Sequence, residues 1–279
     1  MAPGYGRPVE LLDRLQPPAR RRQPSLSLAA RAGLVAHGVL YVTIGLLALE
    51  VARGGGREQA DGRGAIEALA EQPFGWALLL LLAVGLAALA LWKAAQALRG
   101  DPVAGDEPAD RALYAGKAVL YASLAASAAA ALGGGSSGGS GDQQARSWTA
   151  RAMELPGGRL LVALVGLGVV GYALHALWER AVHARFMEQL DRSALRARAA
   201  GTIRRLGQIG YAARSTVLVL VGAFLVRAAW EFDPDEAKGL SESLHELAAS
   251  GWRPVLWFVA LGLVAFGLLS VVLARYRRI

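Results

Sequence analysis

The sequence predicts an all-α integral membrane protein, with six transmembrane helices arranged as three parallel helical-hairpin repeats with pseudo-threefold symmetry. Three observations lead to this prediction: long apolar runs, basic charge that alternates between connections, and an internal repeat. Of the 279 residues, 54% are hydrophobic and 19% are charged, and the mean hydropathy is +0.34. Soluble domains contain about 45–50% apolar and about 25% charged residues.

Six apolar runs are long enough to cross a bilayer, which takes a helix of about 20 residues. They lie at residues 33–52, 75–97, 112–132, 159–181, 208–230 and 252–274. The third run is the weakest because it is rich in Ala. A large soluble helical bundle is the alternative, but soluble helices keep a polar face that these runs lack.

Two segments outside these runs predict irregular structure. Residues 1–25 contain five prolines and the run Arg20-Arg21-Arg22, which predicts a disordered basic tail rather than a cleaved signal peptide. Residues 133–141 consist of Gly and Ser, which predicts a flexible insert.

The distribution of basic residues predicts the orientation. With the N-terminus inside, 21 of the 30 Lys and Arg residues lie in the cytoplasmic segments, as the positive-inside rule requires. We therefore expect a multi-pass protein of a bacterial inner (plasma) membrane with both termini cytoplasmic. The sequence pI of about 10.3 then follows from topology, and no nucleic-acid partner is predicted.

An internal repeat relates the spans in pairs. The pattern of Arg31–Tyr41 recurs at Arg111–Tyr121, and Tyr211–Arg214 matches Tyr114–Lys117. Each repeat is a hairpin of an outgoing helix, an outer loop and a returning helix, with predicted boundaries 26–105, 106–200 and 201–279. Two spans restore the orientation, so the copies are parallel.

Two further features of the repeat predict how it packs. Outer-loop segments such as Ala65–Glu71 and Leu240–Ala248 are amphipathic, and we expect them to rest on the outer interface. Small residues let membrane helices approach closely. The candidates are Gly38, Gly45, Ala125, Ala126, Gly166, Gly171, Gly262 and Gly267. The spacing also aligns Gly85, Gly171 and Gly267 in the three returning helices.

The repeated motif resembles that of the domain of unknown function 1206 family of bacterial membrane proteins. The residues that carry it are Gly33–Gly45, Tyr114–Lys117 and Gly210–Gly222, and the resemblance covers about residues 28–278. Only the third copy keeps the motif's Arg, and only the second and third keep its Tyr. The resemblance implies a membrane protein of three paired-helix repeats and no particular activity.

The repeat places His37, Lys117 and Arg214 at the same position of the three outgoing helices. Ionisable residues inside a membrane are costly and are functional candidates by default. One hypothesis is a ring that binds an anion, a phospholipid headgroup or an acidic metabolite from the cytoplasm. The other is that the side chains only extend to the headgroups at the nearby helix starts. Tyr41 and Tyr121 are interpreted as packing residues.

No pattern predicts catalysis. The chain has no Cys, its four His lack metal-ligand spacing, and no Asp or Glu lies in the middle of a span. We therefore expect no metal and no cofactor, and a non-enzymatic membrane scaffold or interaction protein. The alternative is binding or transport of an anion, lipid headgroup or small metabolite by the basic ring, and a membrane enzyme comes third. The bilayer, with its anionic headgroups, is the only partner that the patterns indicate.

Overall fold

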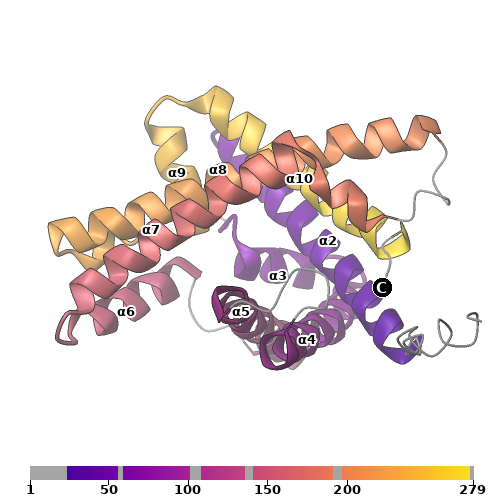
Figure 1. Ribbon diagram of the computed structural model, residues 1–279, viewed down its shortest axis with the longest axis horizontal. Coiled ribbons are helices and arrows are strands. Elements are labelled where there is room, and N and C mark those ends of the chain that lie inside the picture. Colours follow the sequence, from indigo (N-terminus) through magenta and orange to yellow (C-terminus); the bar gives the residue numbers. More distant parts are fainter. Residues whose placement is uncertain (1–23, 56–58, 101–107, 136–140, 191–196, 277–279) are drawn as a thin grey trace, which may run out of the picture.

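The computed structural model describes residues 24–55, 59–100, 108–135, 141–190 and 197–276. Most of the predicted tail and residues 136–140 of the predicted insert lie outside these residues, while helix α2 begins at Pro24. The helices, shown in Figure 1, are α2 (Pro24–Ala52), α3 (Gly62–Ala70), α4 (Gly75–Arg99), α5 (Pro108–Leu132), α6 (Gly141–Met153), α7 (Gly158–Ala176), η1 (Leu177–Val182), η2 (Arg185–Gln189), α8 (Ala197–Glu231), η4 (Pro234–Glu236), α9 (Leu240–Ala249) and α10 (Arg253–Tyr276).

Six helices are long and apolar enough to cross a membrane, which confirms the six predicted spans. They cover Arg31–Ala52, Gly75–Arg99, Asp110–Leu132, Gly158–Val182, Ala200–Glu231 and Arg253–Tyr276. The main departure is the fifth span, which starts well before the predicted residue 208. The Ala, Arg and Leu residues that precede it favour helix, so α8 continues through this polar stretch.

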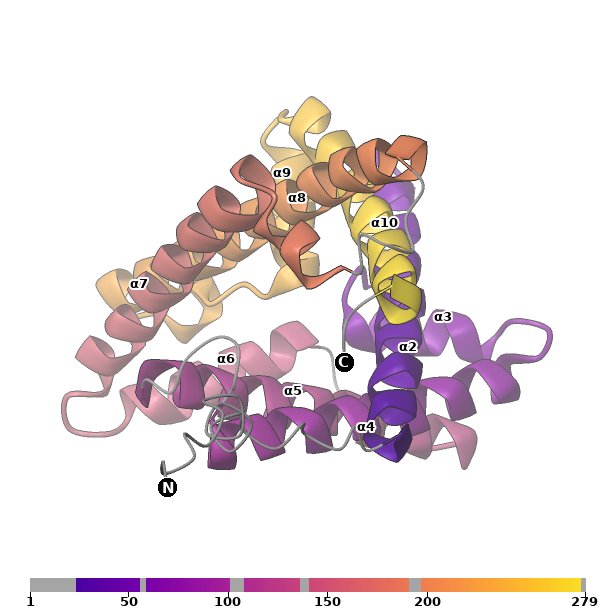
Figure 2. The ribbon, with the colours of Figure 1, turned by 45° about the vertical axis from the view of Figure 1, so that its right-hand side comes forward.

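The long helices form three antiparallel pairs: α2 with α10, α5 with α4, and α8 with α7. In each pair, the outgoing helix of one repeat packs on the returning helix of the repeat before it, counted around the chain. Figures 1 and 2 show the three pairs inclined to one another around a common centre. Two corners of this arrangement are closed, by packing of α2 on α4 and of α8 on α10. At the third corner, α5 and α7 share no comparable packing in the described part of the chain, so the pseudo-threefold symmetry stays a prediction.

Glycines allow the pairs to pack backbone against backbone. A Cβ at Gly267 would lie 2.6 Å from the Val42 nitrogen, and a Cβ at Gly166 would lie 2.9 Å from the Gly222 oxygen. Gly38, Gly45 and Gly262 are equally crowded, which confirms these five predicted positions as contact sites. Gly171 and Ala126 are wrong predictions, because Gly171 faces open space and Ala126 is exposed.

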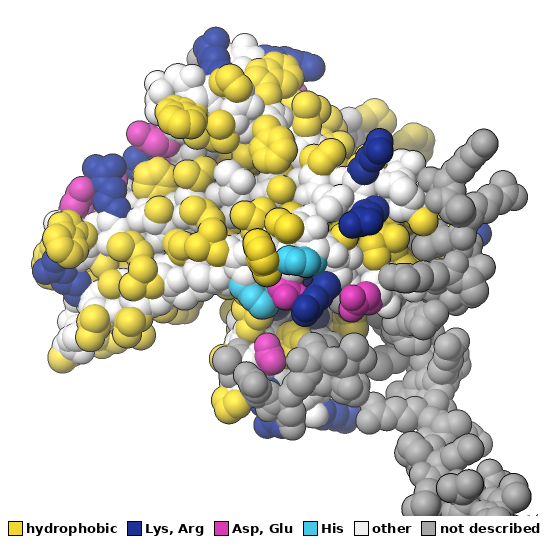
Figure 3. Space-filling view, turned by 45° about the horizontal axis from the view of Figure 1, so that its top comes forward, with side chains coloured by type: hydrophobic (Ala, Val, Ile, Leu, Met, Phe, Trp, Pro, Cys, Tyr) yellow, Lys and Arg dark blue, Asp and Glu magenta, His cyan; other side chains and the backbone are white. Residues whose placement is uncertain are grey.

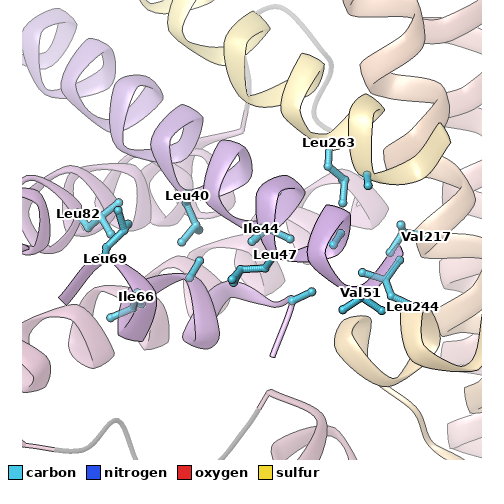
Figure 4. Packing of buried hydrophobic residues seen from close by; sticks show 14 of the residues in the cluster. Leu40, Ile44, Leu47, Val51, Ile66, Leu69, Leu82, Val217, Leu244 and Leu263 are labelled. Carbon is cyan, nitrogen blue, oxygen red and sulfur yellow. The ribbon is translucent and has the colours of Figure 1, made fainter. Parts of the chain in front are cut away.

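The centre of the core lies on α2 and α10. Figure 4 shows Leu40, Ile44 and Leu47 of α2 packed near Ile66 and Leu82 of neighbouring helices. Of the most apolar part of the first span, 61% of residues are buried, compared with 11% for the third span. Helix α5 is therefore peripheral. Hydrophobic side chains are widely exposed on the face seen in Figure 3, as a lipid-facing surface requires.

The short helices α3, α6 and α9 close one end of the bundle, which we call the loop end. The sequence predicts that such helices rest on the outer membrane interface, and their place relative to the membrane stays a prediction. The apolar faces of α3 and α9 are covered by the spans. Ile66 and Leu69 of α3 and Leu244 of α9 are buried in the core cluster with residues of the spans. Amphipathicity shows that a face needs covering, but a protein surface can cover it as well as lipid.

Buried polar side chains tie the three loop-end helices together. They are Asp61 at the start of α3, Asp142 at the start of α6 and Ser241 at the start of α9. Asp61 accepts a hydrogen bond from the Gly141 N–H at 3.1 Å, and Asp142 accepts one from the Glu242 N–H at 3.1 Å. Ser241 accepts one from the Ala60 N–H at 3.2 Å, which returns to the first repeat. A side chain of each repeat thus accepts a hydrogen bond from a backbone N–H at or just before the short helix of the next repeat, and the third repeat is followed by the first.

Stability should depend on the charge of Asp142. Burial raises the pKa of Asp142 from 3.8 to about 6, and the nearby carboxylates of Asp61 and Glu242 add to this effect. The cation nearby, Arg146, forms its ion pair with Glu242. The folded state therefore holds this proton more tightly than the unfolded state, and the stability from Asp142 falls as pH rises from about 4 to 6. Asp142→Asn keeps the acceptor for Glu242 but cannot ionise.

We expect Asp142→Asn to be more stable than wild type above pH 7, by about 1–2 kcal/mol after solvent screening at the loop end. The two proteins should converge toward pH 4. Unfolding midpoints of both in detergent, measured from pH 4 to 8, check this difference. Parallel curves would show that Asp142 does not titrate as proposed.

Candidate functional site

The three basic residues predicted from the repeat converge inside the bundle, away from the loop end. His37 of α2 is buried, and its ring lies 4.6 Å from the ring of Tyr41 and 5.7 Å from that of Tyr121. Arg214 of α8 donates a hydrogen bond from Nε to the Tyr41 hydroxyl at 3.3 Å. Tyr41 therefore joins the basic residues of the first and third repeats.

The returning helices supply aromatic rings beside Arg214 and Lys117. The Arg214 guanidinium lies 5.3 Å from the Phe266 ring, and Lys117 Nζ lies 5.1 Å from the Tyr172 ring. Both distances suit cation–π interactions. We call His37, Lys117, Arg214, Tyr41, Tyr121, Tyr172 and Phe266 the basic–aromatic cluster.

A hydrogen-bond chain orients His37. Ser270 Oγ donates to the Phe266 carbonyl at 3.0 Å and lies 3.2 Å from His37 Nδ1. A hydroxyl has one proton to donate, so Ser270 accepts its second bond from Nδ1–H. In a neutral His37 ring, Nε2 is then the acceptor. This tautomer is assigned from the hydrogen bonds of Ser270.

A fourth cation, Arg180, stands beside the cluster on the π-helical segment η1. Its guanidinium lies 5.4 Å from the Tyr211 ring, and that ring lies 5.2 Å from the Phe266 ring of the cluster. Short π-helical segments often occur at functional sites because they re-aim side chains. Arg180 is one of the 21 basic residues that the predicted topology places in the cytoplasmic segments.

The cluster holds positive charge without carboxylates. Within the described ranges, Lys117, Arg180, Arg214 and His37 make no ion pair, and Glu side chains pair instead with other cations. Inside a membrane an unpaired cation is costly. Phenol hydroxyls and guanidinium N–H groups can donate hydrogen bonds to an anion, so the arrangement is suited to bind one.

The structure also changes two interpretations made from the sequence. Tyr41 and Tyr121, interpreted as packing residues, contact His37. The returning helices align differently from the predicted set of Gly85, Gly171 and Gly267. A Cβ at Gly85 would meet Ala36, and one at Gly262 would meet Ala213, so Gly85 corresponds to Gly262.

Among the described residues, no group of three or more His, Asp or Glu side chains is placed to hold a metal ion.

These features define a multi-pass membrane protein built from three hairpin repeats. A family model described as "Domain of Unknown Function (DUF1206)" matches residues 32–100, 112–182 and 209–277. The chain belongs to this family, which confirms the resemblance and the three repeats, and each match lies inside one predicted repeat boundary. The exact boundaries stay a prediction.

One curated relative extends the comparison over nearly the full length. The chain is 28% identical over 259 residues to the "Uncharacterized protein YxxB" of Bacillus subtilis (strain 168), covering 91% of this chain and 92% of that protein. No solved structure matches the chain. The comparisons indicate no activity, so a function has to be argued from the site.

Proposed function

We propose that the protein binds an anionic group at the basic–aromatic cluster, in the plasma membrane of a bacterium and with both termini in the cytoplasm. The observation that carries the proposal is the meeting of His37, Lys117 and Arg214, from three repeats, without a carboxylate partner among the described residues. This extends the sequence hypothesis of a basic ring.

The energetics of buried charge support a ligand. A Lys or Arg at the centre of a membrane helix costs about 2.5–3.5 kcal/mol on insertion scales. Hydrogen bonds between charged groups contribute about 1.5–3 kcal/mol each. An anion that contacts both Lys117 and Arg214 would therefore offset much of the cost of placing them there.

The location supports access from the cytoplasm or from the bilayer. Helices α3, α6 and α9 cover the loop end, which is the external end in the proposed orientation. His37, Lys117 and Arg214 lie 15, 15 and 17 residues before the ends of α2, α5 and α8 at the loop end, which is about 23–26 Å along the helices. The proposal is for binding rather than catalysis, because the cluster offers basic groups and phenols but no carboxylate or thiol.

A membrane scaffold, which the sequence patterns favour, is the second candidate. The supporting observation is the exposed apolar surface of α7, where Leu160, Leu164 and Leu167 are each more than half exposed. Lipid covers such a surface equally well, whereas it does not account for the cluster. We therefore place anion binding first.

The double variant Lys117→Gln/Arg214→Gln should weaken anion binding about tenfold or more, because at least two charge-assisted contacts are lost. The probe is pyrophosphate, added at low ionic strength to detergent-purified protein. Its binding should raise the unfolding midpoint of wild type in a concentration-dependent way and leave that of the double variant nearly unchanged.

Arg227→Gln is the matched control, since Arg227 lies on the same helix α8 but pairs with Glu231 at 2.9 Å near the loop end. This variant should respond to pyrophosphate as wild type does. An equal response from all three proteins would reject the cluster as an anion site.

A further inference from the structure

We propose that the anion is the headgroup of a phospholipid, which reaches the cluster sideways from the bilayer through the open corner between α5 and α7. This inference rests on the proposed function and adds the class of ligand and its route. We call this corner the α5–α7 seam, defined by Leu113, Gly116 and Leu120 of α5 with Leu164, Gly168 and Tyr172 of α7.

The equivalent corners in the first and third repeats are closed by small residues. In the first, a Cβ at Gly33 would lie 2.9 Å from the Gly85 oxygen, and a Cβ at Gly85 would lie 2.4 Å from Ala36 Cβ. In the third, a Cβ at Gly210 would lie 2.7 Å from the Phe266 backbone. A Cβ at Gly262 would lie 2.2 Å from Ala213 Cβ. Both corners therefore allow backbones to touch.

The second repeat lacks the glycine that allows close packing of the two helices in the other repeats. Leu113 stands where the other copies have Gly33 and Gly210. Those glycines leave no room even for a Cβ, so a Leu side chain prevents the same close approach of α5 to α7. The corner is therefore open because of its sequence.

Room remains beside Leu113 at the level of the cluster. Gly116 takes the place of Ala36 and Ala213, and Gly168 takes the place of Gly85 and Gly262. A Cβ at either position would meet nothing within 4 Å. Gly116 directly precedes Lys117, and Gly168 lies one helical turn before Tyr172, whose ring is 5.1 Å from Lys117 Nζ. The seam therefore leads to Lys117 and Arg214. Figure 2 shows α5 and α7 on different sides of the helix arrangement.

The chemistry of the seam favours a lipid over a soluble anion. Leu120 on the Gly116 face and Leu164 on the Gly168 face are 54% and 56% exposed, so the route is apolar where it meets the bilayer. Its inner edge carries Lys117 and Arg214, which pair with no carboxylate of the residues that the structure describes. An amphiphile with an anionic head and acyl chains matches both parts.

The test uses native mass spectrometry of detergent-purified protein with equal amounts of dioleoyl phosphatidylglycerol and dioleoyl phosphatidylcholine. Wild type should retain phosphatidylglycerol about tenfold better. Gly116→Leu and Gly168→Leu fill the seam without touching the cations, and each should lower phosphatidylglycerol retention about fivefold or more. Leu favours helix more than Gly, so we expect both variants to fold, which their unfolding midpoints verify.

Ala115→Leu is the matched control, because it adds the same side chain to exposed α5 surface about 100° around the helix. It should bind as wild type does. Seam variants that retain phosphatidylglycerol normally would overturn the lateral route, and equal retention of both lipids would overturn the anionic headgroup.

The pyrophosphate experiment separates the two proposals. Pyrophosphate stabilisation that depends on Lys117 and Arg214, without selective lipid retention, would leave anion binding standing and reject the lipid. If Lys117→Gln/Arg214→Gln changed neither response, the function itself would fail. A dimer that Gly116→Leu converts to a monomer would show that a second copy fills the seam, which also overturns the inference.

Discussion

Gly267→Val is expected to lower the free energy of unfolding by about 3 kcal/mol, since overpacking of a tight contact costs about 1–3 kcal/mol and sometimes more. A Cβ at Gly267 would lie 2.6 Å from the Val42 nitrogen and 2.7 Å from the Gly38 oxygen. Both are backbone atoms, so no side chain can rotate away. Helices α2 and α10 would have to separate, and they form the centre of the core.

Gly168→Val is the matched control for this prediction. It makes the same change in a returning helix, but a Cβ at Gly168 meets nothing within 4 Å. Unfolding of both variants in mixed micelles with increasing denaturing detergent would measure the difference. Equal losses of stability would show that the effect comes from β-branching within a helix rather than from the contact between α2 and α10.

Asp61→Ala is expected to lower the free energy of unfolding by about 2–3 kcal/mol, because helix caps contribute about 0.5–2 kcal/mol and a further buried donor is left unpaired. The Asp61 carboxylate accepts hydrogen bonds from the Arg63 and Gly64 N–H groups, both at 2.9 Å, and from the Gly141 N–H at 3.1 Å. The last bond joins the first repeat to the second.

Asp61→Asn separates the helix cap from the hydrogen bond between repeats. The amide oxygen can still cap α3, and Asn is as good a cap as Asp, but its NH2 group cannot accept the hydrogen bond that the Gly141 N–H donates to the second carboxylate oxygen. Burial raises the pKa of Asp61, so loss of its charge should cost little. We expect the Asn variant, which keeps the cap of α3 but not the bond to Gly141, to unfold between the wild type and the Ala variant. An Ala variant as stable as wild type would contradict the role of this cap.

The repeats show how a duplicated hairpin can acquire a specialised copy. Three outgoing helices each bring one basic residue to the cluster, and three loop-end helices cap one another in sequence. The second repeat alone replaces a contact glycine with Leu113, and its two helices are the most exposed of the six. An opening at one corner follows from this single divergence, and the proposed lipid route depends on it.

The sequence located the spans well because hydropathy is a local property that each helix carries by itself. It also aligned the outgoing helices correctly, so His37, Lys117 and Arg214 were found together. It failed for the returning helices, where glycines recur closely enough to permit several registers. Tyr172 and Phe266 were therefore missed, although each lies under one of the predicted cations.

The sequence by itself determined the membrane class, the six helices and the three repeats, because apolar length and periodicity act within one segment of chain. Only the tertiary structure decided which glycines touch, where the amphipathic loop helices are buried, and which corner stays open. Those outcomes depend on contacts between distant segments. The difference between Gly33 and Leu113 becomes meaningful only when the backbone facing Gly33 is known to lie within 2.9 Å.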